Sequence, residues 1–255
     1  GEEEEEDEGS SGDELVEDGV DMEEEEDEDG DEKPAKKKKA GSEKGGKALK
    51  FRLPGTATEM PYVFDCPMSM EELLDLFEKH ATSVEDVCTI IDRIIKCHNV
   101  KLAAGNREKM HNFYGLLLRR VAALGHARAV GGRAARGADK ELDFLAGAVV
   151  GLTRQLPAGA APLWGRWLRE QQRALGKRLR DHALGGAASC WPGAGELLLL
   201  RLLFRCWPAT DRRHPVATPA LLLLGQCLAQ CPVVGAGDAA AGTFCAALLA
   251  EGCAE

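Results

Sequence analysis

The chain has 255 residues and a formal net charge of −10, but this charge is confined to one end. Residues 1–32 hold 21 of the 42 acidic residues and no Lys or Arg, and residues 33–52 carry nine basic residues against one acid. No apolar run reaches the length of a membrane span and no signal-peptide pattern occurs, so we expect no membrane partner.

Two regions follow from this charge distribution. Residues 1–52 are predicted to be a disordered segment, first acidic and then lysine-rich, because such sequence cannot bury apolar surface. The acidic part is interpreted either as a solubilising tail or as an electrostatic tail that binds basic proteins or shields a basic surface. Residues 53–255 keep 23 basic and 20 acidic residues and are long enough to form a substantial core.

A lysine run follows the acidic block directly. A dense, extended lysine run suits capture by an import receptor or by a phosphate backbone, although it also balances the preceding acids. We therefore predict a nuclear-import signal whose candidate residues are Lys33, Lys36, Lys37, Lys38 and Lys39.

Helical periodicity begins near residue 69. Ser69 and Ser83 each precede acidic residues and an apolar stripe, which is typical of a capped helix start. A third helix is expected from about Asn106 through Leu124. The segment 125–137, rich in Gly, Ala and Arg, is predicted to be a loop.

Further helical patterns cover the rest of the chain. One begins near Asp139 and stops at Pro157, one carries Trp164 to Leu179, and another follows Pro192. No strand-like alternation and no clean repeat length emerge. We predict an all-α fold of stacked irregular helical pairs, HEAT-like in style, whose domain is incomplete at its C-terminal end.

The stretch DRRHPVATPALLLLGQCLAQCP at 211–232 is the most distinctive part of the chain. Thr218 is predicted to cap a helix with Pro219 at its first position, and Cys231-Pro232 to end it. One face is expected to carry the apolar core: Leu221, Leu224, Gly225 and Leu228. Cys227 and Cys231 lie four residues apart and suit a metal, but no second ligand pair is present, so buried thiols are favoured.

Signatures of catalysis, cofactors and metals are missing from the sequence. It contains no phosphate-binding loop, no dinucleotide fingerprint and no metalloprotease motif. His214 has no nucleophile or carboxylate at a useful spacing, and His98 suits the C-terminal end of a helix. The nine cysteines fit reduced thiols. We therefore predict no enzyme, no cofactor and no metal site.

Arginines near the expected loop form a weaker candidate site. They are Arg119, Arg120, Arg128, Arg133 and Arg136. These side chains are suited to phosphate contact, and they are equally well explained as solvated charges.

Two segments resemble a known family. EMPYVFDCPMSMEELLDLF, continuing through DRIIKCHNVKLAAGNREKMHNFYGLLL (59–118), and FRCWPATDRRHPVATPALLLLGQCLAQCPV (204–233) are similar to the nucleolar protein 14 family of the small-subunit processome. The matching positions include Lys96, Cys97, Gly105 and Asn106 in the first segment and His214, Pro215, Val216, Thr218, Pro219, Ala220, Cys231 and Pro232 in the second. Residues 125–190 depart from the family pattern.

The resemblance implies a non-catalytic scaffold of the nucleus and nucleolus, needed for pre-rRNA processing and small ribosomal subunit assembly. Implied partners are other processome proteins, the pre-rRNA and snoRNA particle and an import receptor that binds the lysine run. The family's greater length, and a first residue that is Gly, lead us to expect an internal or truncated piece. The alternative function is a histone chaperone or nuclear transport adaptor with an acidic tail.

Overall fold

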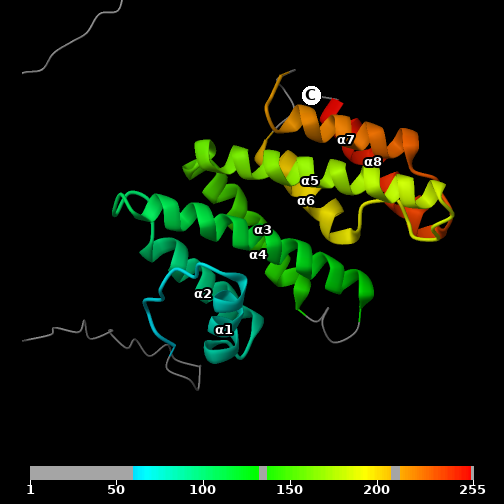
Figure 1. The fold of residues 1–255 in the computed structure, drawn as a ribbon. Coiled ribbons are helices and arrows are strands. Elements are labelled where there is room, and N and C mark those ends of the chain that lie inside the picture. The colour runs from blue at the N-terminus through cyan, green and yellow to red at the C-terminus, as the bar shows by residue number, and fades with distance from the viewer. Residues whose placement is uncertain (1–59, 132–136, 208–212, 254–255) are drawn as a thin grey trace, which may run out of the picture. The chain divides into compact units, whose positions relative to one another are not determined.

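The computed structural model describes residues 60–131, 137–207 and 213–253. The predicted acidic and lysine-rich segments, including all five import candidates, lie outside the described residues. The described part contains eight helices and no strand (Figure 1). They are α1 (Met70–His80), α2 (Val84–Cys97), α3 (Asn106–Val130), α4 (Ala138–Gln155), α5 (Pro157–Ala183), α6 (Ala194–Cys206), α7 (Ala217–Gln230) and α8 (Ala236–Cys253).

Serine caps start the first two helices, as the sequence predicts. The Glu72 amide donates a hydrogen bond of 3.1 Å to Ser69 Oγ. At α2 the bonds are reciprocal, because the Asp86 amide donates to Ser83 Oγ and the Asp86 carboxylate accepts from the Ser83 amide. Each cap satisfies N–H groups that have no partner inside the helix.

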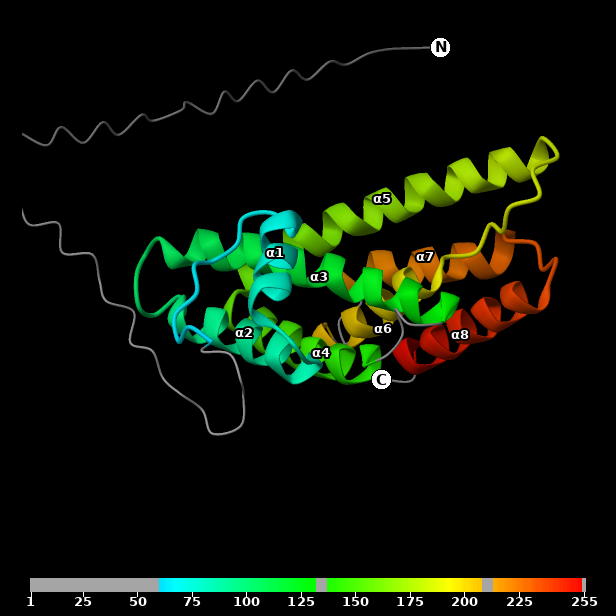
Figure 2. The ribbon, with the colours of Figure 1, turned by 90° about the horizontal axis from the view of Figure 1, so that it is seen from below.

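The helices pack as an irregular stack, which confirms the all-α prediction. Consecutive helices α3 and α4 lie side by side, as do α7 and α8, and α6 packs against α3, α4 and α8. Helix α5 departs from this pairing, because it packs mainly against α7 and α3 and lies along the outer side of the stack (Figure 2). Among the described helices none is long and apolar enough to cross a membrane.

A hydrogen-bonded cluster fixes the centre of the stack. Trp164 of α5 donates through Nε1 to Tyr114 Oη of α3 at 2.7 Å, and Tyr114 Oη lies 2.7 Å from Thr153 Oγ1 of α4. All three side chains are buried, and burial raises the pKa of the Tyr114 hydroxyl. Because each buried polar atom has a partner, the cluster joins three helices in one arrangement.

The predicted loop at 125–137 is wrong over its first half. Helix α3 continues to Val130, and only residues 131–137 remain for the connection to α4. Gly125 serves helix packing instead of ending the helix, since a Cβ placed there would lie 2.8 Å from Gly195 Cα of α6. Paired glycines thus let two helix backbones approach closely, and a sequence pattern does not separate this role from a helix stop.

Candidate functional site

The first group of motif residues lies at the turn between α2 and α3. Asn106 donates through Nδ2 to the Asn99 carbonyl at 3.1 Å, and Gly105 occupies the position just before α3. Lys96 pairs with Asp92 on the same helix at 2.6 Å, with both side chains exposed. Cys97 is the last residue of α2 and is half-buried. These contacts shape a turn and bring no reactive groups together.

His214 carries the N-terminal cap of α7. Its Nδ1 accepts hydrogen bonds from the amides of Val216 (3.1 Å) and Ala217 (3.0 Å). The prediction that Thr218 caps this helix is therefore wrong, since Thr218 already lies inside its first turn. The physical reason is that Pro215 keeps the preceding residue out of the helical region, which leaves the His214 ring beside the first free amides.

The ring of His214 also packs against an aromatic neighbour. Its centroid lies 5.3 Å from that of Trp207, the residue that follows α6. Because Nδ1 accepts two amide hydrogens, the proton of the neutral ring is assigned to Nε2. His214 thus holds the entry to α7, and no carboxylate hydrogen-bonds to it among the contacts of the described residues.

The buried face of α7 differs from the predicted one. Leu224 is fully buried as expected, but Leu221, Gly225 and Leu228 are only half-buried. The face that packs consists of Ala217, Ala220, Leu223, Leu224 and Cys227. Helix α7 contacts three other helices, α5, α6 and α8. Its buried face is therefore broader than the predicted one and lies on a different side of the helix.

Four thiols lie in one apolar region around the end of α7. Cys190, Cys227, Cys231 and Cys245 are buried, and Cys231 Sγ donates to the Cys190 carbonyl at 3.6 Å. Burial raises the pKa of Cys227 to about 11 and that of Cys231 to about 12. Thiols held neutral in this way make poor metal ligands and nucleophiles.

No metal site accompanies these thiols. Within the part of the chain that the structure describes, no three His, Cys, Asp or Glu side chains are grouped so as to hold a metal ion. Pro232, which follows Cys231 at the end of α7, accepts through its carbonyl a hydrogen bond of 2.9 Å from Trp191 Nε1. The Cys231-Pro232 pair therefore ends the helix and anchors a neighbouring loop.

Of the five arginines suggested from the sequence as phosphate contacts, two form ion pairs within the fold, one is exposed and two lie outside the described residues. Arg120 forms two hydrogen bonds to the buried Glu141 carboxylate, at 2.7 and 3.0 Å, and Arg128 pairs with Asp139 at 2.5 Å. Both are thus engaged within the fold. Arg119 is exposed, whereas Arg133 and Arg136 lie outside the described residues.

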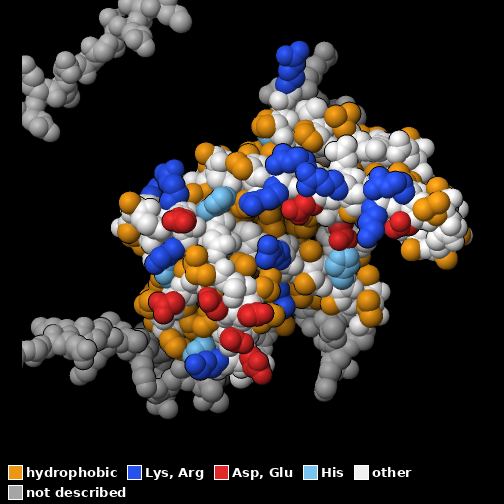
Figure 3. All heavy atoms as spheres, in the orientation of Figure 1, with side chains coloured by type: hydrophobic (Ala, Val, Ile, Leu, Met, Phe, Trp, Pro, Cys, Tyr) orange, Lys and Arg blue, Asp and Glu red, His pale blue; other side chains and the backbone are white. Residues whose placement is uncertain are grey.

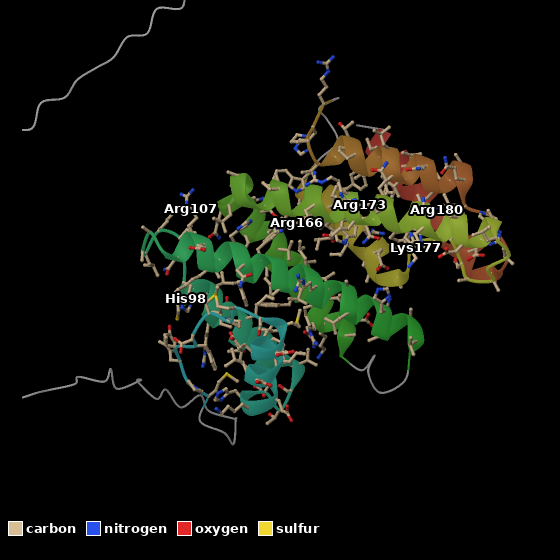
Figure 4. The ribbon with its side chains drawn as sticks, viewed as in Figure 1. His98, Arg107, Arg166, Arg173, Lys177 and Arg180 are labelled. Atoms are coloured by element: carbon tan, nitrogen blue, oxygen red, sulfur yellow. The ribbon has the colours of Figure 1, made fainter. Side chains whose placement is uncertain are left out.

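A row of cations on α5 is the most prominent charged feature. We call it the basic ridge, and it consists of Arg166, Arg173, Lys177 and Arg180, whose side chains follow the length of α5 in Figure 4. All four are exposed. At about 100° per residue they share a sector of about 60° on the helix.

The core side of α5 lies opposite the ridge. Trp164, Leu168 and Leu175 are buried there, about half a turn away from the cations. On the face drawn in Figure 3, Lys and Arg side chains gather over α5, and acidic side chains gather over α1 and α2. The fold thus fixes the helix by one side and exposes its charges on the other.

The ridge cations are not neutralised by ion pairs. Every ion pair found within residues 60–131, 137–207 and 213–253 joins other side chains, although Glu170 lies at the edge of the sector. Like charges three or four residues apart on a helix destabilise it by about 0.2–0.5 kcal/mol per pair. Within the ridge, Arg173 with Lys177 and Lys177 with Arg180 are such pairs, so this part of the row has an energetic cost that an external anion would remove. Glu170 offsets the charges at the other end, since it lies four residues from Arg166 and three from Arg173.

A groove opens beside the N-terminal end of the ridge. Its volume is about 770 Å³ and it lies between α1, α3 and α5. Trp167, His111, Arg119 and Arg166 are among its lining residues, and His111 Nε2 lies 2.7 Å from the Gly159 carbonyl. The groove thus combines an aromatic ring with two arginines at its edge.

Sequence reasoning missed the basic ridge. It assigned α5 correctly as a helix but considered only its apolar side. The missing signal is in the sequence, since the four cations stand at intervals of seven, four and three residues, which is the period of one helix face.

Comparison with known proteins identifies the chain's relatives. A sequence profile of the Nop14-like family matches residues 1–254. Mouse nucleolar protein 14 is 32% identical over 195 residues, covering 76% of this chain and 21% of the mouse protein. The human protein of the same name is 31% identical over 215 residues, covering 83% of this chain and 22% of its own.

A more distant relative comes from yeast. Nucleolar complex protein 14 of Saccharomyces cerevisiae is 27% identical over 165 residues, covering 65% of this chain and 19% of the yeast protein. The chain therefore spans about a fifth of the length of these relatives. No solved structure matches it. Because the family profile matches nearly its full length, the chain belongs to the Nop14-like family.

Proposed function

We propose that this chain is a non-catalytic segment of a nucleolar scaffold that acts in pre-rRNA processing and small ribosomal subunit assembly. The observation that carries the proposal is the family match over residues 1–254. The relatives in mouse, human and yeast are named as nucleolar proteins, which supports placement in the nucleus and nucleolus.

The roles of the motif residues support a scaffold. His214 caps a helix, Asn106 closes a turn, and Cys231 and Pro232 join α7 to a loop. All are structural contacts of the kind that hold a helical stack in shape. A rigid helical stack with a charged outer face is suited to holding partners in a fixed relation.

The proposed partners follow from the family and from charge. They are other processome proteins, the pre-rRNA and snoRNA particle, and an import receptor that binds the lysine run at 33–39. The charged surface over α5 supports a polyanionic partner.

Sedimentation tests this function. The complete protein that contains this chain, carrying an epitope tag, should sediment with pre-ribosomal particles from nuclear extract and move to lighter fractions after RNase treatment. Recovery only in light fractions, with stoichiometric binding of purified histones in the absence of RNA, would contradict the proposal and favour the histone-chaperone alternative.

A further inference from the structure

We propose that the basic ridge of α5 binds the phosphate backbone of double-helical RNA. The inference deepens the proposed function, because it rests on a role in RNA particles and assigns a direct RNA contact to named residues. It starts from Arg166, Arg173, Lys177 and Arg180, which are exposed and have no ion pairs among the described residues.

The ridge is held in place before any ligand arrives. Trp164 is fully buried and hydrogen-bonded to Tyr114 at 2.7 Å, and Leu168 and Leu175 are buried along the same side of α5. The helix therefore cannot rotate about its axis without breaking core contacts. A row of cations on a fixed helix loses little conformational freedom on binding, apart from that of the side chains themselves.

The chemistry of the cations fits phosphate. Three of the four are arginines, whose planar guanidinium groups donate paired hydrogen bonds to phosphate oxygens. From Arg166 to Arg180 the row extends about 21 Å, at 1.5 Å per residue. Several phosphates of a continuous backbone fit along this length, so each cation has its own anion.

The composition of the ridge sector favours a backbone over bases or a protein surface. Between 166 and 180 the sector holds only the four cations, with Arg169 and Glu170 at its two edges. The nearest aromatic ring, Trp167, lies about 100° around the helix from Arg166 and lines the neighbouring groove, so the row itself offers no succession of rings on which single-stranded bases would stack. The row also lacks the apolar or aromatic anchor on which protein interfaces depend. Double-helical RNA is recognised largely through shape and backbone, which such a row matches.

Binding of a duplex to matched variants tests the inference. The ligand is a fluorescent RNA duplex of roughly 20 base pairs and arbitrary sequence, since double-stranded RNA modules contact a similar length. The test variant of the full chain carries Arg166→Gln, Arg173→Gln, Lys177→Gln and Arg180→Gln. The control carries Lys79→Gln, Lys109→Gln, Arg154→Gln and Arg201→Gln, four exposed cations on four other helices. Both variants keep residues 1–52 and change the net charge equally.

We expect the ridge variant to bind the duplex at least about tenfold more weakly than the wild type at moderate salt, and the control less than about twofold. The slope of log affinity against log salt should fall by about 3 to 4 in the ridge variant, because each phosphate contact contributes about 0.9. Equal losses in both variants, or no loss in either, would overturn the inference. So would a ridge variant that loses binding to polyglutamate but keeps its affinity for RNA. Matching urea midpoints for the three proteins show that the fold is intact.

This experiment separates the ridge from the proposed function. A protein that sediments with pre-ribosomes while its ridge variant binds the duplex like the wild type refutes the ridge alone. Ridge-dependent duplex binding by a protein that never sediments with pre-ribosomes refutes the proposed function alone.

Discussion

Helices α5 and α7 pack against each other, yet they differ in what their distinctive residues do: those of α7 make contacts within the fold, and those of α5 face solvent. Helix α7 carries family-motif residues, and its entry is capped by His214 and its exit by Cys231. Helix α5 presents four exposed cations that form no ion pair among the described residues. The motif in α7 therefore marks backbone and packing requirements, whereas the exposed charge of α5 marks a surface that is open to a partner.

The largest expected effect concerns the packed side of α7. Leu224→Asp places a carboxylate at a fully buried position and should lower the free energy of unfolding by about 4 kcal/mol or more, with loss of the cooperative melt. Leu222→Asp is the matched control, because Leu222 is 70% exposed on the same helix, and it should change stability by less than about 0.5 kcal/mol. Thermal melts followed by circular dichroism compare the two. Similar melting temperatures would mean that α7 is not packed as described.

The next effect concerns alkaline pH and the thiols around α7. Burial raises the pKa of Cys227 from its ordinary value of 9.0 to about 11, and that of Cys231 to about 12. The unfolded chain therefore loses these protons first. The stabilisation that the neutral thiols provide is complete below pH 9, and it is lost as the pH rises through about 11 for Cys227 and about 12 for Cys231.

Urea midpoints measured between neutral and strongly alkaline pH should show this decline. Cys231→Ala should make the decline shallower. A midpoint that stays constant in the wild type across pH 9 to 11 would contradict the buried, neutral state of these thiols.

A smaller effect separates the true cap of α7 from the predicted one. His214→Ala removes the acceptor for two backbone amides and should cost about 1–2 kcal/mol, as for other helix caps. Thr218→Ala should cost less, because Thr218 lies inside the first turn of α7, where the amide of Ala220 already donates to the Val216 carbonyl. Urea unfolding of both variants gives the order, and a larger loss for Thr218→Ala would restore the cap predicted from sequence.

The smallest effect on stability is expected on the outer side of α5. Replacing the four ridge cations by Gln should leave the free energy of unfolding unchanged within about 0.5 kcal/mol, or raise it slightly, because like-charge repulsion is removed. Arg120→Gln provides the contrast, since it strips the buried Glu141 of its charged partner and should cost about 2 kcal/mol or more. A large loss in the ridge variant would show that these cations support the fold.

Sequence patterns sufficed where a local rule decides the structure. Ser69 and Ser83 stand before acidic residues and apolar stripes, so both helix starts follow from capping alone. The pattern failed at Gly125, whose role depends on Gly195 of a distant helix. It failed at Thr218 because a proline placed a histidine ring where a cap is needed. A tertiary contact decided the first case, and one sequence does not contain such contacts explicitly. The second case is a local contact, since the His214 ring accepts from amides two and three residues further along the chain.

The candidate site was hidden for a different reason. The sequence contains the helical spacing of the four basic-ridge cations. Whether these side chains are exposed and free of ion pairs depends on the neighbouring helices. Arg120 illustrates this, since it is a candidate from sequence alone and is paired with Glu141 in the structure. The spacing of cations thus predicts a charged helix face, and the packing of neighbouring helices determines whether those cations are exposed and unpaired.

Protein–RNA cross-linking followed by mass spectrometry shows directly whether the basic ridge contacts RNA. The full chain is bound to the RNA duplex, cross-linked and digested, and the peptides that carry nucleotide are identified. We expect cross-linked peptides from α5 that span residues 166–180, with Lys177 among the modified positions. Cross-links confined to the lysine-rich residues 33–52, with none in α5, would contradict it.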